Sequence, residues 1–293
     1  MSAVPIDITN APVQARQVSA WQVFRRNKSA VTGLVILLII VLATIFGPML
    51  YRVSPFAVVG PTHLAPGASG APLLGTDKLG RDIFAGILNG GRVTLLVGAA
   101  AAALSAVIGL VVGGLSGFYG GFADSALMRF TEFFQVLPAL LLALVVVSLF
   151  GPNFLTITIS IGIVTWPGTA RLIRAEFLRI RQLEYVKAAK SIGARDLRIM
   201  LRLVLPNALP PALVYTTLII GISMLLEAGL SFIGATNPNT LSWGLMLGDN
   251  RDQILVAWWP VVFPGLAIFF SVLSVSLIGD GLNDALNPKG RDR

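Results

Sequence analysis

Long uncharged runs separate short charged segments along most of this chain. One such run lies between Lys28 and Arg52, and others follow at intervals as far as Asp280. A helix needs about 20 consecutive apolar residues to cross about 30 Å of bilayer hydrocarbon, and these runs reach that length. They predict six membrane-spanning helices, at 30–50, 93–118, 127–150, 154–172, 208–232 and 258–279.

The run between Glu132 and Arg171 is too long for a single spanning helix. Gly151, Pro152 and Asn153 interrupt it, and such a tripeptide is a turn signal. We therefore expect two helices joined by a tight hairpin at this point.

The composition indicates that these apolar helices belong to a membrane protein. Of 293 residues, 55% are hydrophobic and 12% are charged, whereas a soluble domain carries roughly 25% charged residues. This composition excludes a soluble enzyme and predicts an all-α, multi-pass membrane protein. The chain has no cysteine, and His63 is its one histidine, which excludes disulfides, a thiol nucleophile and a zinc site built from His and Cys.

The excess of positive charge, +8 at neutral pH, indicates topology rather than nucleic-acid binding. With the N-terminus inside, the inner segments of the six-helix arrangement hold 17 Lys and Arg residues and the outer segments hold 5, together the 22 of the sequence. Because inner loops collect Lys and Arg, both termini are predicted to be cytoplasmic. The first apolar run is too long for a cleaved signal peptide and is expected to remain as an anchor.

These assignments divide the chain into five parts. They are a cytoplasmic N-terminal tail (1–29), the first spanning helix (30–50), an external loop (51–92), a core with five spanning helices (93–282) that includes an inner loop at 173–207, and a cytoplasmic C-terminal tail (283–293).

Four glycines recur at every fourth position in the second predicted span: Gly109, Gly113, Gly117 and Gly121. Such spacing places them on one face of a helix, and a stripe without side chains lets two membrane helices approach closely. The stripe is interpreted as helix packing, either within this chain or against a second subunit.

Two intramembrane acids are singled out by the pattern. Glu132 lies three residues after Arg129, which suggests a local ion pair. Glu227 has no basic residue within four positions, and an isolated carboxylate at depth must face a cavity or a partner. We therefore predict that Glu227 lies beside a translocation pathway or makes a structural hydrogen bond; a proton relay is a weaker alternative.

The inner loop between Arg171 and Arg202 is strongly basic and contains a helical pattern. Tyr185, Ala188, Ala189 and Ile192 fall on one face at helical spacing, and Gly193 is expected to end the helix. Small residues on that face indicate a helix pressed against protein rather than lying on a membrane surface.

These residues resemble a known family. Glu184, Ala188, Ala189 and Gly193, followed by Leu205-Pro206-Asn207, are similar to the "EAA" loop of permease subunits of ABC importers. The fuller form of that loop has a histidine where this chain has Leu203, so any role of that histidine does not carry over.

Further strings narrow the resemblance to the second, C-type permease of the dipeptide, oligopeptide and nickel importers, over about residues 20–290. They are Leu74-Gly75-Thr76-Asp77-x2-Gly80-Arg81-Asp82, then Glu227-Ala228-Gly229-Leu230-Ser231-Phe232-Ile233-Gly234 with Ser242-Trp243-Gly244-x-Met246, and finally Trp259-Pro260-x3-Pro264-Gly265 with Gly279-Asp280-Gly281-Leu282-x-Asp284-Ala285-Leu286-x-Pro288-Lys289.

The resemblance implies a type I importer permease of the bacterial inner membrane that works by alternating access. Its implied partners are a homologous second permease, two ATPase subunits that bind ATP and Mg, an external solute-binding protein and the lipid bilayer. It also implies that the inner-loop helix is a coupling helix, with Glu184 pairing with the ATPase and Ala188 and Ala189 packing against it.

The residues independently favour a separate ATPase. None of the five lysines follows a glycine, whereas a Walker A loop needs Gly directly before its Lys. The chain is therefore predicted to be non-catalytic and to hold no cofactor of its own. The alternative function is a secondary transporter driven by an ion gradient. The substrate stays open among dipeptides, oligopeptides, nickel chelates, glutathione, opines and other small solutes.

The external-loop motif of Gly75, Asp77, Gly80, Arg81 and Asp82 could be mistaken for an acid/base set. No nucleophile or metal cluster accompanies it, so we interpret it as a structural turn or a docking contact. His63 is expected to be solvated. Asp280 and Asp284 are expected to cap or orient a short helix after the last span, with a docking role as the alternative.

Overall fold

The chain folds into helices throughout the part described by the computed structural model, residues 20–286. The elements are α1 (Ala20–Arg26), α2 (Lys28–Leu50), α3 (Ile83–Tyr119), α4 (Gly121–Val136), α5 (Ala139–Phe150), α6 (Phe154–Ile180), α7 (Glu184–Ser191), α8 (Asp196–Ile199), η1 (Met200–Val204), α9 (Leu205–Phe232), α10 (Trp243–Asn250), η2 (Arg251–Gln253) and α11 (Trp259–Leu286). Within 20–286 there is no β-strand, so the all-α prediction is confirmed.

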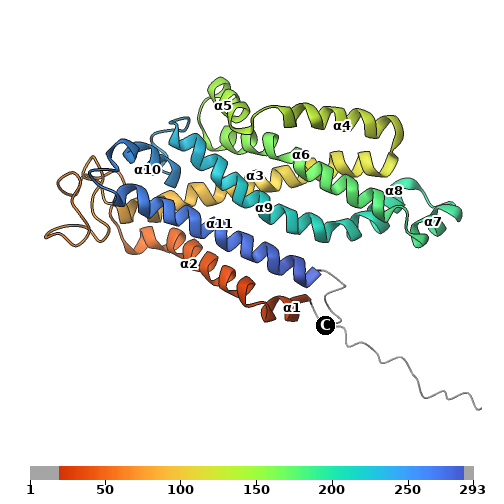
Figure 1. Ribbon diagram of the computed structural model, residues 1–293, viewed down its shortest axis with the longest axis horizontal. Helices are drawn as coiled ribbons and strands as arrows, with labels where there is room; N and C mark the ends of the chain where they lie inside the picture. Colours follow the sequence, from red (N-terminus) through yellow and green to blue (C-terminus); the bar gives the residue numbers. More distant parts are fainter. Residues whose placement is uncertain (1–19, 287–293) are drawn as a thin grey trace, which may run out of the picture.

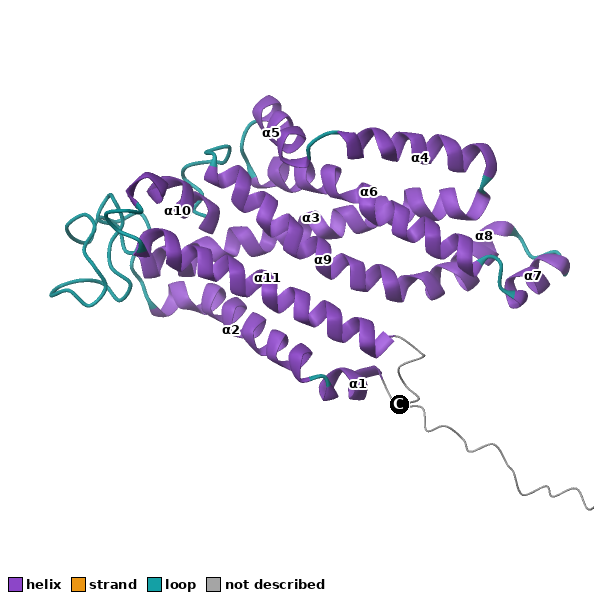
Figure 2. Ribbon diagram, in the orientation of Figure 1, coloured by secondary structure: helices purple, strands orange, loops and turns teal. Residues whose placement is uncertain are grey.

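The long helices lie side by side in an elongated bundle (Figure 1). The helix α3 packs along α6 and α9, while α2 packs along α11. The loop 51–82 and α10 lie at one end of the bundle, and α7, α8 and α1 lie at the opposite end (Figure 2). The fold therefore separates the predicted external loop from the predicted inner loop by the length of the helices.

Four helices are individually long and apolar enough to cross a membrane: α2, α3, the continuous helix 196–232, and α11. The pair α4 and α5 makes a fifth if it counts as one broken span. The helix α6 is not in this set, since its apolar half contains Thr, Ser and Gly and its last turns contain Arg171, Arg174 and Arg179. The count of six spans stays a prediction.

The third predicted span, 127–150, is not one straight helix. The helices α4 and α5 meet at an angle of 87°, with Leu137 extended and Pro138 preceding the first residue of α5. Proline disfavours the helical conformation of the residue before it and offers no N–H for the preceding turn. The Leu-Pro pair inside an apolar run was the signal for this bend.

The predicted hairpin between the next two helices is confirmed. α5 ends at Phe150, Gly151 follows with φ of 83°, and α6 begins at Phe154. The side chain of Asn153 accepts a hydrogen bond from the N–H of Thr156 at 2.9 Å, which caps α6.

Parts of both predicted tails are helical. Residues of the 1–29 segment form α1, whose Phe24 packs with Ala30 and Ala285. The segment 283–293 is helical up to Leu286. Asp280 and Asp284 lie inside α11 and cap no separate helix; Asp284 Oδ2 instead accepts a hydrogen bond from Asn27 Nδ2 at 2.8 Å. Pro288 and Lys289 lie outside the described residues.

The fifth predicted span, 208–232, belongs to a longer helix. A π-helical turn, η1, joins α8 to α9, so the chain is continuously helical over residues 196–232. Leu203 lies in this turn, partly buried against the cluster of Phe177, Ile199 and Val204. The position where relatives are expected to carry histidine is thus an apolar packing position here.

Candidate functional site

The inner-loop helix α7 projects from the end of the bundle and is fixed at its C-terminus. Gly193 has φ of 81°, its N–H donates to Lys190 O at 3.0 Å, and the N–H of Ala194 donates to Ala189 O at 3.1 Å. These two bonds form a Schellman motif, in which glycine relieves the strain of a positive φ. The helix therefore ends where the sequence predicts.

Glu184 stands at the start of α7 with its side chain 92% exposed. It pairs with Lys187 Nζ at 3.1 Å, one turn later. An exposed pair of this kind contributes under about 1 kcal/mol. The carboxylate is therefore available for a stronger partner outside this chain.

The buried face of α7 differs from the predicted one. Val186 is buried and Ala189 is partly buried, both against the cluster that includes Ile180. Tyr185 and Ile192 are 45% and 86% exposed, and Ala188 is exposed as well. The predicted apolar face is therefore mostly open in this chain, because the base of the bundle contacts the neighbouring face.

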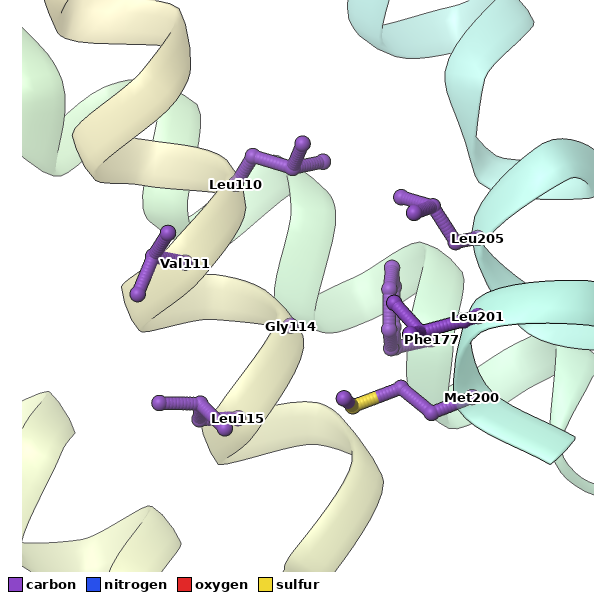
Figure 3. A pocket seen from close by; sticks show the side chains of 8 residues that line it. All are labelled: Leu110, Val111, Gly114, Leu115, Phe177, Met200, Leu201 and Leu205. Carbon is purple, nitrogen blue, oxygen red and sulfur yellow. The ribbon is translucent and has the colours of Figure 1, made fainter. Parts of the chain in front are cut away.

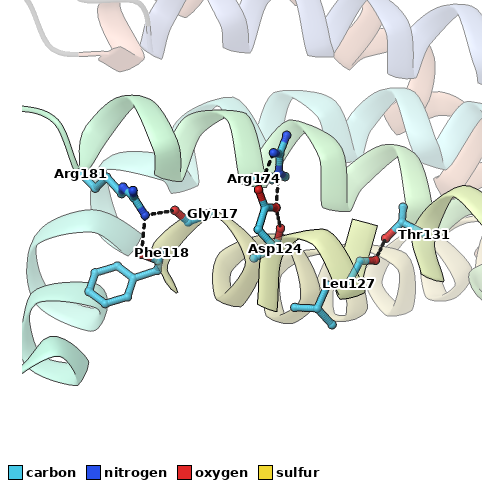
Figure 4. A network of polar contacts seen from close by, with 8 residues as sticks. Gly117, Phe118, Asp124, Leu127, Thr131, Arg174 and Arg181 are labelled. Atoms are coloured by element: carbon cyan, nitrogen blue, oxygen red, sulfur yellow. Dashed lines mark hydrogen bonds and ion pairs between the residues drawn. The ribbon is translucent and has the colours of Figure 1, made fainter. Parts of the chain in front are cut away.

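The helix α6, which leads into α7, is clamped to α3 and α4 by its Arg174 and by Arg181, the residue that follows it (Figure 4). Arg174 donates to Asp124 through Nε at 2.5 Å and through Nη2 at 2.6 Å. Arg181 Nη1 donates to the carbonyl of Phe118 at 2.8 Å, at the C-terminus of α3. Bidentate Arg–carboxylate pairs and cations at a helix C-terminus are both stabilising. Sequence reasoning missed these residues because the partners are distant in the chain.

Two cavities flank this clamp. One, of about 180 Å³, is lined by apolar side chains of α3, α6, η1 and α9, with Gly114 on one wall and Phe177 and Met200 on the other (Figure 3). The second, of about 220 Å³, lies at the base of α7 and includes Arg181 and Lys190. The first is lined almost wholly by apolar groups, whereas the lining of the second includes charged side chains.

Three of the four predicted stripe glycines lie where α3 meets α6. A Cβ on Gly109 would lie 2.5 Å from Thr169 Cβ, and one on Gly117 would lie 2.7 Å from Arg174 O. A Cβ on Gly113 would collide with the carbonyl of Ala170. This close contact between α3 and α6, here called the seam, lies within the chain. Gly121 does not belong to it, because α3 ends at Tyr119 and Gly121 begins α4 with open space around it.

At the opposite end, the external-loop motif forms a compact turn. Asp77 Oδ1 accepts hydrogen bonds from the N–H groups of Leu79 and Arg81, both at 2.8 Å. Gly75 and Gly80 have φ of 78° and 73°, and a Cβ at either would strike a backbone carbonyl. Arg81 lies over the ring of Phe56 at 5.3 Å. The geometry is that of a structural turn.

Asp82 links this turn to two helices. Its Oδ1 accepts from the N–H of Phe84 at 2.8 Å and caps α3, while its Oδ2 accepts from the Tyr51 hydroxyl at 2.5 Å, just after α2. The hydrogen bond to Asp82, with burial and the carboxylate charge, raises the pKa of Tyr51 from 10.0 to about 12. The phenol therefore stays protonated at ordinary pH and can donate to Asp82.

Glu227 is 1% exposed and enclosed by its own chain. Its Oε1 accepts from the Ser231 hydroxyl at 2.7 Å. The predicted hydrogen bond is present. The adjacent cavity holds about 20 Å³, too little for a peptide, and a place for Glu227 beside a translocation pathway stays a prediction.

Two smaller expectations are wrong. His63 is only partly exposed, with φ of 54°, and its Nε2 is buried without a hydrogen-bond partner. No ion pair joins Arg129 to Glu132 within the described chain; both are exposed on α4. Across residues 20–286 no group of three or more His, Asp or Glu side chains is arranged to hold a metal.

Comparison with known proteins gives two family matches. Residues 105–292 match the family described as binding-protein-dependent transport system inner membrane component. Residues 18–66 match the N-terminal transmembrane domain of oligopeptide transport permease C.

Curated relatives match over nearly the whole chain. A di/tripeptide transport system permease protein of Pseudomonas aeruginosa is 40% identical over 276 residues, 92% of this chain and 91% of the relative. A dipeptide transport system permease protein of Bacillus subtilis is 37% identical over 291 residues, 97% and 89% of the two chains. A glutathione transport system permease protein of Pectobacterium atrosepticum is 38% identical over 271 residues, 92% and 90%.

Proposed function

Because the chain belongs to the family of binding-protein-dependent transport system inner membrane components, we propose that it is the permease subunit of an ATP-driven ABC importer. It carries short peptides or related small solutes, delivered by an external binding protein, across the membrane by alternating access. It acts with a homologous second permease and with ATPase subunits that bind ATP and Mg. The chain itself catalyses no reaction.

The proposed topology has six spans with both termini in the cytoplasm. The spans are α2, α3, the bent pair α4–α5, α6, the continuous helix 196–232, and α11. The placement of the basic α7 loop and α1 at one end of the bundle supports this arrangement, as does the excess of Lys and Arg in the inner segments.

The exposed face of α7 is the observation that carries the mechanism. Glu184 and Ala188 are open to a partner, while Arg181 and Arg174 tie the preceding helix to α3 and α4. A force applied to α7 by an ATPase would therefore reach α6, α3 and α4 directly. This supports the role of α7 as the coupling helix.

The substrate class rests on the relatives. Those named above are permeases for di/tripeptides, dipeptides and glutathione, which all contain peptide bonds and free carboxylates. We propose a short peptide or a peptide-like thiol as the solute of this chain.

Substitutions in α7 test the proposal. Glu184→Lys reverses the charge at the proposed interface, where a partly desolvated pair contributes a few kcal/mol. Gly193→Val places a branched side chain at a positive φ and disturbs the end of α7. We expect both variants to insert and assemble, but to lose about tenfold or more of ATP-dependent peptide uptake and of substrate-stimulated ATP hydrolysis. Uptake into proteoliposomes and ATPase assays would measure this.

Asp252→Lys provides the matched control, because it makes the same reversal of charge at an exposed position of η2, outside the proposed spans. It should retain uptake. Wild-type stimulation and uptake in both α7 variants would show that α7 does not couple the permease to an ATPase. Uptake that needs no ATP in the wild type would instead favour an ion-driven transporter.

A further inference from the structure

The two cavities beside the clamp follow one another along α3. The apolar cavity, of about 180 Å³, is lined on this helix by residues between Leu110 and Leu115. The polar cavity, of about 220 Å³, is lined on the same helix by Phe118 and Tyr119, in its last turn. Both volumes are several times the roughly 30 Å³ that one water molecule occupies, so each cavity has room for a larger group.

The other walls of the two cavities show the same order. Phe177 of α6 lines the apolar cavity, and Arg181, one turn later in the chain, lines the polar one. Met200 of η1 lines the apolar cavity, and Ile199, the residue before it, lines the polar one. The cavities are therefore neighbours along three helical segments, the apolar one toward the middle of the bundle and the polar one toward the end that carries α7.

Positive charge predominates around the polar cavity. Arg181 and Lys190 line it, and Asp196 is the sole acid among the described residues that do so. The side chain of Lys190 is exposed and has no hydrogen bond or ion pair within residues 20–286. The adjacent segment adds three exposed basic residues that likewise form no ion pair in the described chain: Arg195, Arg198 and Arg202. Opposite charges attract, so this cavity favours an anion.

The apolar cavity restricts that anion to an amphipathic one. Val111 and Leu115 of α3 are 54% and 37% exposed, and Leu201 of η1 is 49% exposed, so the mouth of the cavity is apolar and open at the surface of the chain. Inorganic phosphate, or an acidic side chain of a partner protein, would use the polar cavity alone. A phospholipid with a negatively charged headgroup would fill both.

We propose that these two cavities bind one anionic phospholipid of the cytoplasmic leaflet. Its acyl chain would lie against Phe177 and Met200, and its phosphate would lie beside Arg181. Basic pockets between membrane helices on the cytoplasmic side are typical sites for anionic headgroups, and an exposed tyrosine such as Tyr119 is typical of the membrane boundary. This inference rests on the proposed topology and not on the transport activity. The lipid would stabilise the base of α7.

Native mass spectrometry of the purified, delipidated complex of the permease with its partners tests this site without any transport reaction. Phosphatidylglycerol and phosphatidylcholine with identical acyl chains are titrated separately, so the two ligands differ in headgroup charge. We expect phosphatidylglycerol to bind about fivefold more tightly or better, since one basic side chain near an anionic headgroup contributes about that factor. Inorganic phosphate at the same concentration should not compete, because it leaves the apolar cavity empty.

Two variants, each with a matched control, assign the binding to these cavities. Lys190→Gln should weaken phosphatidylglycerol binding by about fivefold, whereas Lys187→Gln makes the same change on α7 outside the cavity and should not. Val111→Trp fills the mouth of the apolar cavity and should weaken the binding of both lipids. Val107→Trp, about one turn earlier at an exposed position, should weaken neither. Partner subunits also bind lipid, so the difference between a variant and its control reports this site.

Equal affinities of the wild type for the two lipids would overturn the proposal, and so would phosphatidylglycerol binding that survives in both Lys190→Gln and Val111→Trp. Displacement of the lipid by inorganic phosphate would identify a phosphate site instead. Loss of the ATPase from the Lys190→Gln complex, with lipid binding intact, would identify an acidic side chain of the ATPase as the occupant. If one variant does not assemble, the other pair carries the test. None of these measurements requires ATP or peptide, so they are separate from the test of the permease function.

Discussion

Single polar side chains cap several helices of this bundle. Asn27, Asp82, Asn153 and Ser242 each accept a hydrogen bond from a backbone N–H in the first turn of the helix that follows. Each such cap contributes typically about 1 kcal/mol. The role of Asp82 as a turn residue could be predicted from its Gly-rich surroundings, whereas its bond to Tyr51 could not, because 31 residues separate the pair.

The Tyr51–Asp82 bond gives a pH-dependent prediction. Only the protonated phenol donates, so its contribution to stability is full below pH 10 and is lost as pH rises through about 12. Tyr51→Phe should lower the unfolding midpoint at about pH 8 by the loss of roughly 1 kcal/mol. The gap to the wild type should close toward about pH 12. A gap of constant size across that interval would show that the bond does not govern the difference.

At the scale of whole helices, close approach and bends decide the arrangement. Spacing alone predicted the glycine face of α3, and Gly109, Gly113 and Gly117 do meet α6. The same spacing wrongly included Gly121, because nothing in a four-residue repeat marks the end of a helix. The bend at Pro138 was missed for a related reason, since reading from charge to charge ignores proline inside an uncharged run.

Matched alanine substitutions test the seam. Gly113→Ala inserts a Cβ against the Ala170 carbonyl, and overpacking of this kind destabilises by about 1–3 kcal/mol. Gly265→Ala makes the same change in α11, where the nearest atom lies 3.9 Å away. We expect the first variant to have a lower unfolding midpoint than the wild type and the second to have an unchanged one. Both midpoints are measured on the purified complex. Equal midpoints would show that α3 and α6 can separate without loss of stability.

At the scale of the molecule, the sequence predicted the class of fold more accurately than it predicted the tertiary contacts. Uncharged runs predicted the long helices; the structure extends most of them by a few residues to several turns and breaks the third at 137–138. The periodicity of α7 predicted an apolar face that presses against protein but could not say which protein covers it, and most of that face is exposed in this chain. The clamp made by Arg174 and Arg181 depends on α3, α4 and α6 being neighbours, which no local pattern records.

Reporter fusions test the topology of the whole chain. A reporter after Arg293 should be active in the cytoplasm, and one inserted in the loop 55–75 should be active outside, because the basic segments stay inside. Alkaline phosphatase and green fluorescent protein at each site give opposite signals and control for expression. The reverse pattern, or the same side for both sites, would contradict six spans with cytoplasmic ends.

A hydrogen bond between Tyr51 and Asp82 joins the two ends of the external loop, so the spacing of α2 and α3 does not depend on the length of the loop tip. Chain entropy penalises a longer loop only logarithmically, by about 0.6 kcal/mol for each doubling. Its tip at Gly67 and Gly70 is exposed and touches nothing. Residues added or removed there should leave α2 and α3 in register, so the tip should tolerate changes of length without altering the bundle.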